Sequence, residues 1–225
     1  MGILNSRRRL LMVAAALSLT IPAAFAAEDA RAVDFFRAIQ LDNVGPIKRA
    51  LSQGLDPNVR EPERGETGLI VAMRYGAMNT FDLLLAQPGI QLEARAPNGN
   101  TALMMAAFRQ NKSAVLTLLG KGAAVNQPGW TALHYAAASN STDIINLLLE
   151  RHAAIDAPSP SGLTPLMLAA REGQEAAVQL LLERGADATL KDGAYHQTAA
   201  EFATKADKPW IAETIRKHLA SRAKR

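Results

Sequence analysis

Apolar residues gather in short runs along the chain, and the runs come in pairs separated by polar stretches. In each pair an alanine-rich run places a leucine and two alanines on one helical face, and a leucine-rich run follows. Apolar residues at helical spacing, bounded by turn residues, predict short amphipathic helices that bury one face. We therefore expect helix pairs whose core includes the runs at Leu83–Leu85, Ile144–Leu149 and Leu180–Leu182.

The alanine-rich runs share one opening. Threonine, alanine or proline, leucine, and methionine or histidine begin at Thr101, Thr131 and Thr164, and an Ala-Ala pair starts two residues after each opening. Adding Thr67 and Thr198 gives five units at steps of 34, 30, 33 and 34 residues. Self-similarity with a period near 33 is typical of a stacked helical solenoid.

Each unit carries signals for its helix ends. The opening threonine suits an N-cap, where its side-chain oxygen accepts a hydrogen bond from a free backbone N–H, and Pro165 suits the first turn. Gly54, Gly122 and Gly185 follow the second helices, where a left-handed residue ends a helix most easily as glycine. His152 stands at this place in one unit, so we expect that cap to be strained or differently closed.

The ends of the array differ from its middle. A sixth unit precedes the others, with Val33-Asp34-Phe35 at its opening, and the 30-residue step predicts a shortened loop around Val125–Gly129. The segment from Trp210 to Leu219 predicts an amphipathic helix that caps the C-terminal end. Atypical terminal units are expected because one face of each has no neighbour.

The repeated openings resemble those of ankyrin repeats. The resemblance implies an all-α ankyrin-repeat solenoid of about six helix-turn-helix units, joined by short hairpin fingers. We expect this repeat domain to occupy residues 27–220, with a basic tail at residues 221–225. In ankyrin repeats the histidine of the opening ties adjacent units together, which implies a structural role for His134.

Residues 1–26 have the plan of a secretory signal peptide. Arg7, Arg8 and Arg9 precede an apolar stretch, and Ala24-Phe25-Ala26 predicts cleavage after Ala26. The paired arginines also fit a twin-arginine export signal, while ordinary Sec signals carry arginines too, so both export routes remain open. We expect a bacterial protein of the periplasm; the alternative is an uncleaved membrane anchor.

The distribution of charge and the absence of cysteine exclude several classes of function. The chain contains 25 basic and 21 acidic residues, but three arginines would leave with the signal peptide and five bases lie in the last ten residues. The remaining body is mildly acidic, which does not fit a nucleic-acid-binding surface. There is no cysteine, so disulfides, a thiol nucleophile and thiolate metal sites are excluded.

No signature of catalysis or of a cofactor is found. The four histidines do not share a helical face at metal-ligand spacing, Gly120-Lys121-Gly122 lacks the spacing of a phosphate-binding loop, and no Gly-x-Ser-x-Gly motif occurs. We expect no enzyme activity, no cofactor and no metal. The acids Asp56, Asp156 and Asp187 recur at matching positions, which is typical of loop and cap residues.

A partner-binding surface is the functional prediction. The resemblance implies that partners meet the concave face formed by the fingers and the first helices, and counting from each threonine selects the exposed positions. Large aromatic and arginine side chains dominate binding hot spots, although surface aromatics can also pack locally. The predicted binding residues are Arg74, Tyr75, Asn100, Phe108, Arg109, Trp130, Arg171 and Tyr195.

These expectations combine into one function. We expect a monomeric, non-catalytic scaffold that binds a protein in the periplasm; an envelope enzyme or a stress-defence protein would suit that location. Membrane contact would come only from an uncleaved signal or the basic tail. The alternatives are a secreted or membrane-tethered effector that binds a host or competitor protein, and an enzyme whose site has no recognisable motif.

Overall fold

The computed structural model describes residues 23–223. Residues 1–22 of the predicted signal peptide and residues 224–225 of the predicted tail lie outside the described residues. The described part forms twelve helices: α1 (Ala23–Gln40), α2 (Val44–Ser52), α3 (Gly68–Tyr75), α4 (Met78–Leu85), α5 (Ala102–Phe108), α6 (Lys112–Gly120), α7 (Ala132–Ala138), α8 (Thr142–Glu150), α9 (Pro165–Glu172), α10 (Glu175–Glu183), α11 (Ala199–Lys205) and α12 (Pro209–Arg222).

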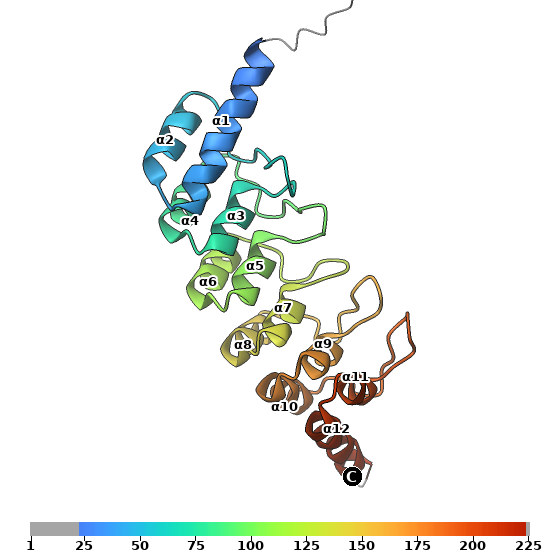
Figure 1. Ribbon diagram of the computed structural model, residues 1–225. Helices are drawn as coiled ribbons and strands as arrows, with labels where there is room; N and C mark the ends of the chain where they lie inside the picture. Colours follow the sequence, from blue (N-terminus) through green and yellow to red (C-terminus); the bar gives the residue numbers. More distant parts are fainter. Residues whose placement is uncertain (1–22, 224–225) are drawn as a thin grey trace, which may run out of the picture.

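The helices stack in two rows along one axis (Figure 1). The inner row consists of α1, α3, α5, α7, α9 and α11, each in contact with the next, and α2, α4, α6, α8, α10 and α12 form the outer row. Five loops, which we call the fingers, project from the inner row: residues 53–67, 86–101, 121–131, 151–164 and 184–198. The predicted all-α solenoid of helix pairs is confirmed.

Small side chains in the inner row let the helices approach closely. Ala106, Ala136 and Ala169 are fully buried between neighbouring inner helices, and the leucines of the outer row fill the space behind them. Leu118, Leu148 and Leu181 are likewise fully buried. One continuous core therefore runs the length of the stack, and no unit has a core of its own.

Threonine ends the fingers and begins the inner helices. The hydroxyl oxygens of Thr101, Thr164 and Thr198 accept hydrogen bonds from backbone N–H groups three residues later, as predicted. The Thr131 hydroxyl lies 2.9 Å from the His134 ring, and the Thr67 hydroxyl has no hydrogen-bond partner among the described residues. The shared opening therefore fixes where the helices begin, although not every threonine uses its hydroxyl in the same way.

Four fingers are closed by a backbone hydrogen bond across the tip. These bonds run from Glu61 to Glu66 (2.9 Å), Ala96 to Asn100 (2.9 Å), Ser159 to Leu163 (2.8 Å) and Asp192 to Gln197 (3.1 Å). The first finger also contains an antiparallel bridge between Arg60 and Thr67. The finger at 121–131 is the short one, as the 30-residue step predicts.

A side-chain ladder joins the bases of successive fingers. At matching positions in four units, a side-chain oxygen accepts the backbone N–H of the next unit. The pairs are Asn58 with Gln91 (2.8 Å), Glu93 with Ala124 (2.8 Å), Asn126 with Ala154 (2.8 Å) and Asp156 with Asp187 (3.1 Å). The predicted loop role of Asp56 and Asp187 is also seen, because each accepts the backbone N–H two residues later.

The left-handed cap positions are occupied as expected. Gly54, Gly122 and Gly185 have φ values of 87°, 94° and 94°. His152 adopts the same region with φ 63°, so this cap has the left-handed backbone without the glycine. An L-residue there carries a steric cost that glycine avoids.

The two ends differ from the expected units. Val33-Asp34-Phe35 does not open a helix, because it lies inside α1, which begins at Ala23 and runs through Ala26. The last helix extends to Arg222, beyond the predicted end at Leu219 and into the predicted tail. No described helix is long and apolar enough to pass through a membrane.

Candidate functional site

Three aromatic side chains meet on the inner face, which we define as the exposed side of α3, α5, α7, α9 and α11 with the fingers beside them. Phe108 at the end of α5 packs edge-to-face on Tyr135 of α7, with ring centroids 6.1 Å apart. Trp130 on the shortened finger lies 6.2 Å from Tyr135 and 5.2 Å from the His134 ring. Phe108 is 47% exposed, and Trp130 and Tyr135 are half-buried. We call Phe108, Trp130 and Tyr135 the aromatic cluster.

His134 holds one side of this cluster in place. Its Nε2 lies 2.9 Å from the carbonyl oxygen of Leu163 in the next finger, and a carbonyl can only accept, so Nε2 carries the proton. Its Nδ1 then accepts from the backbone N–H of Thr131 at 3.2 Å. Burial lowers the pKa of His134, only partly opposed by the bond to Leu163. The side chain joins two units, in agreement with the role that the resemblance implied.

Tyr135 joins the cluster to the neighbouring finger. Its hydroxyl donates a hydrogen bond to Asn100 Oδ1, and Asn100 Nδ2 in turn lies 3.7 Å from the Met105 sulfur. Burial raises the pKa of Tyr135, so the phenol stays protonated and remains a donor. Asn100, predicted to contact a partner, is therefore half-buried and positions Tyr135.

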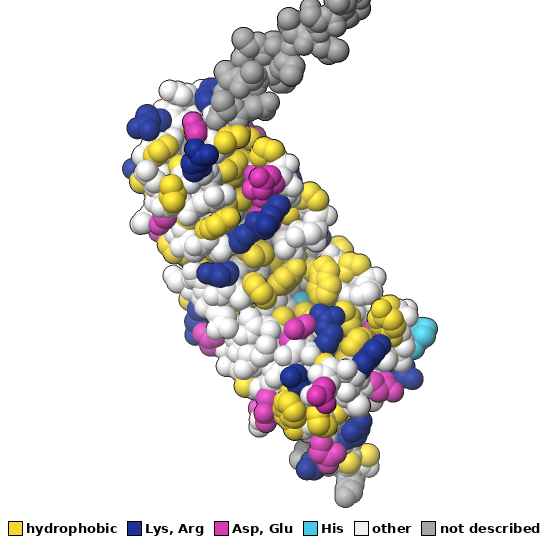
Figure 2. Space-filling model, viewed as in Figure 1, with side chains coloured by type: hydrophobic (Ala, Val, Ile, Leu, Met, Phe, Trp, Pro, Cys, Tyr) yellow, Lys and Arg dark blue, Asp and Glu magenta, His cyan; other side chains and the backbone are white. Residues whose placement is uncertain are grey.

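Two hollows lie side by side along the inner face, with Arg171 in the wall of both. The first has a volume of about 290 Å³ and is lined by the aromatic cluster with Ala138, Leu168, Arg171 and Glu172. The second, also of about 290 Å³, is lined by Arg171, Tyr195, Phe202, Lys205 and Ala206. Figure 2 shows hydrophobic side chains gathered over the middle of the inner row, with Lys and Arg side chains beside them over α9 and α11.

The charged groups beside the hollows are mostly basic. Arg171 contacts the adjacent Glu172, with Nε and Nη2 at 3.0 and 2.9 Å from the carboxylate. Lys205 Nζ lies 4.7 Å from the centroid of the Tyr195 ring. Within residues 31–223, neither Arg109 nor Lys205 has a carboxylate within 4.0 Å. The inner face therefore combines apolar hollows with available positive charge.

Arg74 has a different role from the one predicted. Its guanidinium contacts the carboxylate of Glu66 and lies 4.0 Å from that of Glu61, and both acids are buried. Burial is also the main cause that lowers the pKa of Arg74. A half-buried arginine between two carboxylates holds the first finger against α3. Arg74 therefore has a structural role and is not among the residues of the candidate binding surface.

The remaining predicted residues separate into two groups. Phe108, Trp130, Arg171 and Tyr195 line the two hollows, whereas Arg109, the C-cap residue of α5, lines neither of them. Tyr75 is 50% exposed, but no ring contact among the described residues connects it to the aromatic cluster. Phe108 and Trp130 therefore meet at Tyr135, while Tyr75 lies outside the aromatic cluster.

Sequence reasoning missed Tyr135, Leu168 and Phe202 as members of the hollows. A signal was present for Tyr135. Counting four positions from each opening threonine gives Val71, Met105, Tyr135, Leu168 and Phe202. Tyrosine among purely apolar residues at a core-facing position indicates that its hydroxyl has a partner and that its ring reaches the surface.

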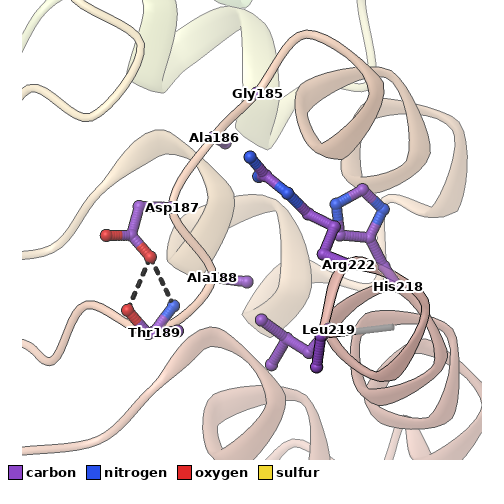
Figure 3. Close-up of a pocket in the computed structure, with 9 residues that line it drawn as sticks. Gly185, Ala186, Asp187, Ala188, Thr189, His218, Leu219 and Arg222 are labelled. Atoms are coloured by element: carbon purple, nitrogen blue, oxygen red, sulfur yellow. Dashed lines mark hydrogen bonds between the residues drawn. The ribbon is translucent and has the colours of Figure 1, made fainter. Parts of the chain in front are cut away.

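A further hollow of about 480 Å³ lies at the C-terminal end of the stack, between the loop Gly185–Thr189 and α12. Figure 3 shows His218 and Arg222 projecting from α12 toward this loop. Asp187 already accepts hydrogen bonds from the backbone and hydroxyl of Thr189, which lower its pKa. The Asp187 carboxylate is thus engaged within its own loop, so this hollow is a weaker candidate for a binding site than the inner face.

The described residues contain no group of three or more histidines and acids placed to hold a metal ion. The titratable groups with shifted pKa values lie in caps, fingers and unit junctions, as His134, Asp156 and Glu201 illustrate. The site that stands out by geometry is a surface for binding.

Known proteins match the chain over its repeats. A family profile described as "Ankyrin repeats (3 copies)" matches residues 35–128 and 115–192. SH3 and multiple ankyrin repeat domains protein 2 of Homo sapiens is 34% identical over 158 residues, which is 68% of this chain and 8% of that protein. Neurogenic locus notch homolog protein 1 of Xenopus tropicalis is 35% identical over 125 residues, or 54% of this chain and 5% of that protein.

Transient receptor potential cation channel subfamily A member 1 of Homo sapiens is 28% identical over 160 residues, covering 66% of this chain and 14% of the channel. The chain thus spans only a small part of the length of these relatives. What is shared is the repeat array. By its repeats and its stacked helix pairs, the chain belongs to the ankyrin repeat family, whose repeats form protein–protein interaction domains.

Proposed function

We propose that this protein is a non-catalytic scaffold of the bacterial periplasm that binds a partner protein on its inner face, at the aromatic cluster and the two hollows. The observation that carries the proposal is the cluster itself. Phe108, Trp130 and Tyr135 come from three different elements; Phe108 and Trp130 both pack on Tyr135, and all three remain partly exposed around a hollow. Aromatic side chains grouped in this way are typical of the centre of a binding interface.

Rigidity supports the same function. The cluster rests on His134, on the Tyr135–Asn100 hydrogen bond and on fully buried Ala136 and Ala137. A partner would therefore meet side chains that are already in place, which reduces the ordering cost of association. The location is proposed from the order of basic, apolar and small residues in positions 1–26.

The function can be tested by cross-linked affinity capture from the periplasm of expressing cells. The full-length gene is expressed as wild type and as Phe108→Ala, a change to a side chain that is 47% exposed and ends α5. Trp210→Ala is the matched control, because Trp210 is 50% exposed but lies on α12, away from the cluster. A partner captured by wild type and the control, and lost from Phe108→Ala, is the expected result.

Circular dichroism of each variant distinguishes lost binding from lost folding. Capture that survives Phe108→Ala in a folded protein would argue against the inner face as the binding surface. Cell fractionation addresses the location: recovery of the processed protein in culture medium, or of the unprocessed protein in membranes, would favour the effector alternatives over a periplasmic scaffold.

A further inference from the structure

We propose that the inner face takes an extended, acidic peptide segment of the partner, with one apolar side chain in each hollow and a carboxylate at Arg171. This inference rests on the proposed function and adds the chemistry of the bound segment. Three observations carry it: two adjacent apolar hollows, the spacing of the helices that form them, and the charge around them.

The hollows are built to receive apolar side chains. Leu168 and Phe202, at matching positions of α9 and α11, are almost fully buried and line the first and second hollow. The aromatic cluster lines the first hollow, and Tyr195, 67% exposed, lines the second. A ring or a branched aliphatic group placed there would cover apolar surface that is now partly in contact with water.

The spacing of the hollows fits an extended chain. The first hollow lies over α7 and α9 and the second over α9 and α11, so they are one inner helix apart. Packed helices are about 8–10 Å apart. A chain in the extended polyproline II conformation advances about 3.1 Å per residue with three residues per turn, so apolar side chains three residues apart lie about 9 Å apart on the same side of it. Arg171, between the hollows, would then face the intervening residues.

The charge favours acidic intervening residues. Lys205 has no carboxylate within 4.0 Å inside the described part of the chain, and Arg171 forms an ion pair there only with its exposed neighbour Glu172. An exposed ion pair of this kind is weak, so Arg171 can exchange Glu172 for a carboxylate of the partner. The residues of the short finger from Gly122 to Thr131 carry no charge.

Two acids, one on the last finger and one on α11, are already engaged in hydrogen bonds. Asp192 is buried and accepts backbone N–H groups of its own finger, and Glu201 accepts from Thr198 at the start of α11. Among the residues that line the two hollows, Arg171 and Lys205 are basic and Glu172 is the one acid, so a basic segment would face two like charges. Electrostatic complementarity therefore selects an acidic segment.

The test uses the full-length protein and fluorescent peptides measured by anisotropy. The designed peptide has the core Phe-Glu-Asp-Phe between glycine-serine flanks. Two controls are Phe-Lys-Arg-Phe, which reverses the charge, and Ala-Glu-Asp-Ala, which removes both apolar side chains. The third, Phe-Glu-Asp-Gly-Gly-Phe, keeps the charge and moves the second phenylalanine two residues further along the peptide. We expect the designed peptide to bind at least about tenfold more tightly than each control, and its advantage over the basic peptide to shrink as salt is raised.

Charge-reversal variants locate the effect. Arg171→Glu combined with Lys205→Glu should weaken binding of the acidic peptide by about tenfold or more and strengthen binding of the basic one. Lys48→Glu combined with Arg49→Glu is the matched control, because it makes the same change of charge at exposed positions of α2 and should leave both affinities unchanged. Circular dichroism verifies that both double variants are folded.

The results separate this inference from the proposed function. Equal binding of the acidic and basic peptides, no binding of any peptide, or equal weakening by both double variants would overturn the acidic-segment proposal. So would tighter binding of a single-stranded oligonucleotide than of the designed peptide. If capture of a partner depends on Phe108 while the peptides show no preference, the inner face remains the binding surface and only the acidic segment is wrong.

Discussion

At the scale of the residue, His134 shows how one side chain joins two units. It is fully buried, donates to the Leu163 carbonyl and accepts from Thr131 N–H. Both partners are backbone groups, so they would lose a hydrogen bond if the ring were removed. The same ring supports Trp130 at 5.2 Å and so connects the framework to the aromatic cluster.

The first prediction concerns pH. Because burial lowers the folded-state pKa of His134 below its ordinary value of 6.5, the unfolded chain binds more protons than the folded one as pH falls through 6.5. The stability due to neutral His134 is thus fully present above about pH 6.5 and is lost as pH falls toward the lowered folded pKa, by at most about 1.4 kcal/mol per pH unit. Urea unfolding at several pH values between about 7.5 and 5.5 measures this loss.

His134→Gln provides the comparison for this prediction. It should be destabilised by about 1–3 kcal/mol at pH 7.5, because buried backbone groups lose their partners, and its stability should depend less on pH than that of wild type. An unchanged pH dependence in a folded His134→Gln protein would show that another group is responsible.

The second prediction concerns His152, whose φ of 63° places an L-residue in the left-handed region. His152→Gly should stabilise the protein by about 0.5–1 kcal/mol, since the steric cost removed exceeds the added entropy of the unfolded chain. Asn140→Gly is the control: Asn140 has φ 60°, but its Oδ1 accepts from Ala177 N–H at 2.9 Å. Thermal unfolding should show a gain for the first substitution and none for the second.

At the scale of the element, neighbouring units are joined by more than helix packing. The side-chain ladder from Asn58 to Asp156 connects the bases of the fingers, and Arg60 and Arg95 reach from one finger to the next. Arg60 Nη1 donates to the carbonyls of Gly65 and Arg95 at 2.7 Å each. The fingers therefore form a connected row, and Trp130 of the aromatic cluster stands on one of them.

The third prediction tests one of these connections. Tyr135→Phe keeps the ring that packs on Phe108 but removes the hydroxyl that donates to Asn100. We expect a loss of about 1 kcal/mol, with the inner face still able to bind, because the apolar wall of the first hollow is preserved. Chemical denaturation gives the loss, and hydrogen exchange of the finger at 86–101 should become faster. Unchanged exchange there would show that Asn100 does not depend on the phenol.

At the scale of the whole molecule, the stack is nearly one-dimensional. Each inner helix contacts the helices next to it in the row, and the core is continuous from Phe35 to Ile215. In such an array, stability is the sum of unit terms and of contacts between neighbours. Damage at an end should therefore stay more local than damage at the centre.

The fourth prediction follows from this architecture. Leu148→Ala in α8 should cost about 2–5 kcal/mol and shift unfolding of the central units, whereas Ile215→Ala in α12 should first release the C-terminal end. Trp130 and Trp210 report on these two regions in the backgrounds Trp210→Phe and Trp130→Phe. Ile215→Ala should lower the urea midpoint of the Trp210 signal more than that of the Trp130 signal. Equal shifts would show that the stack unfolds as a single unit.

The aromatic cluster shows how far the sequence leads toward the site. Counting from the opening threonines placed Phe108 and Trp130 at the surface, and the structure brings both to one hollow. The same count gave Arg74 as exposed, but the finger folds two carboxylates onto it. The position of a residue in its repeat predicts the direction in which its side chain projects from the helix. It does not predict which side chains of the neighbouring finger contact it.

The amino-acid sequence alone specifies the helix pairs, the shortened finger, the left-handed cap at His152 and the start of every inner helix except α1. These features depend on local chemistry repeated along the chain: threonine before a helix, alanine between helices, and glycine or its substitute after one. The contacts between stacked units, by contrast, make Tyr135 the centre of the aromatic cluster, place Asn100 as its hydrogen-bond partner and bring two hollows to Arg171. Those facts depend on contacts between units about 30 residues apart, which exist only once the units have stacked.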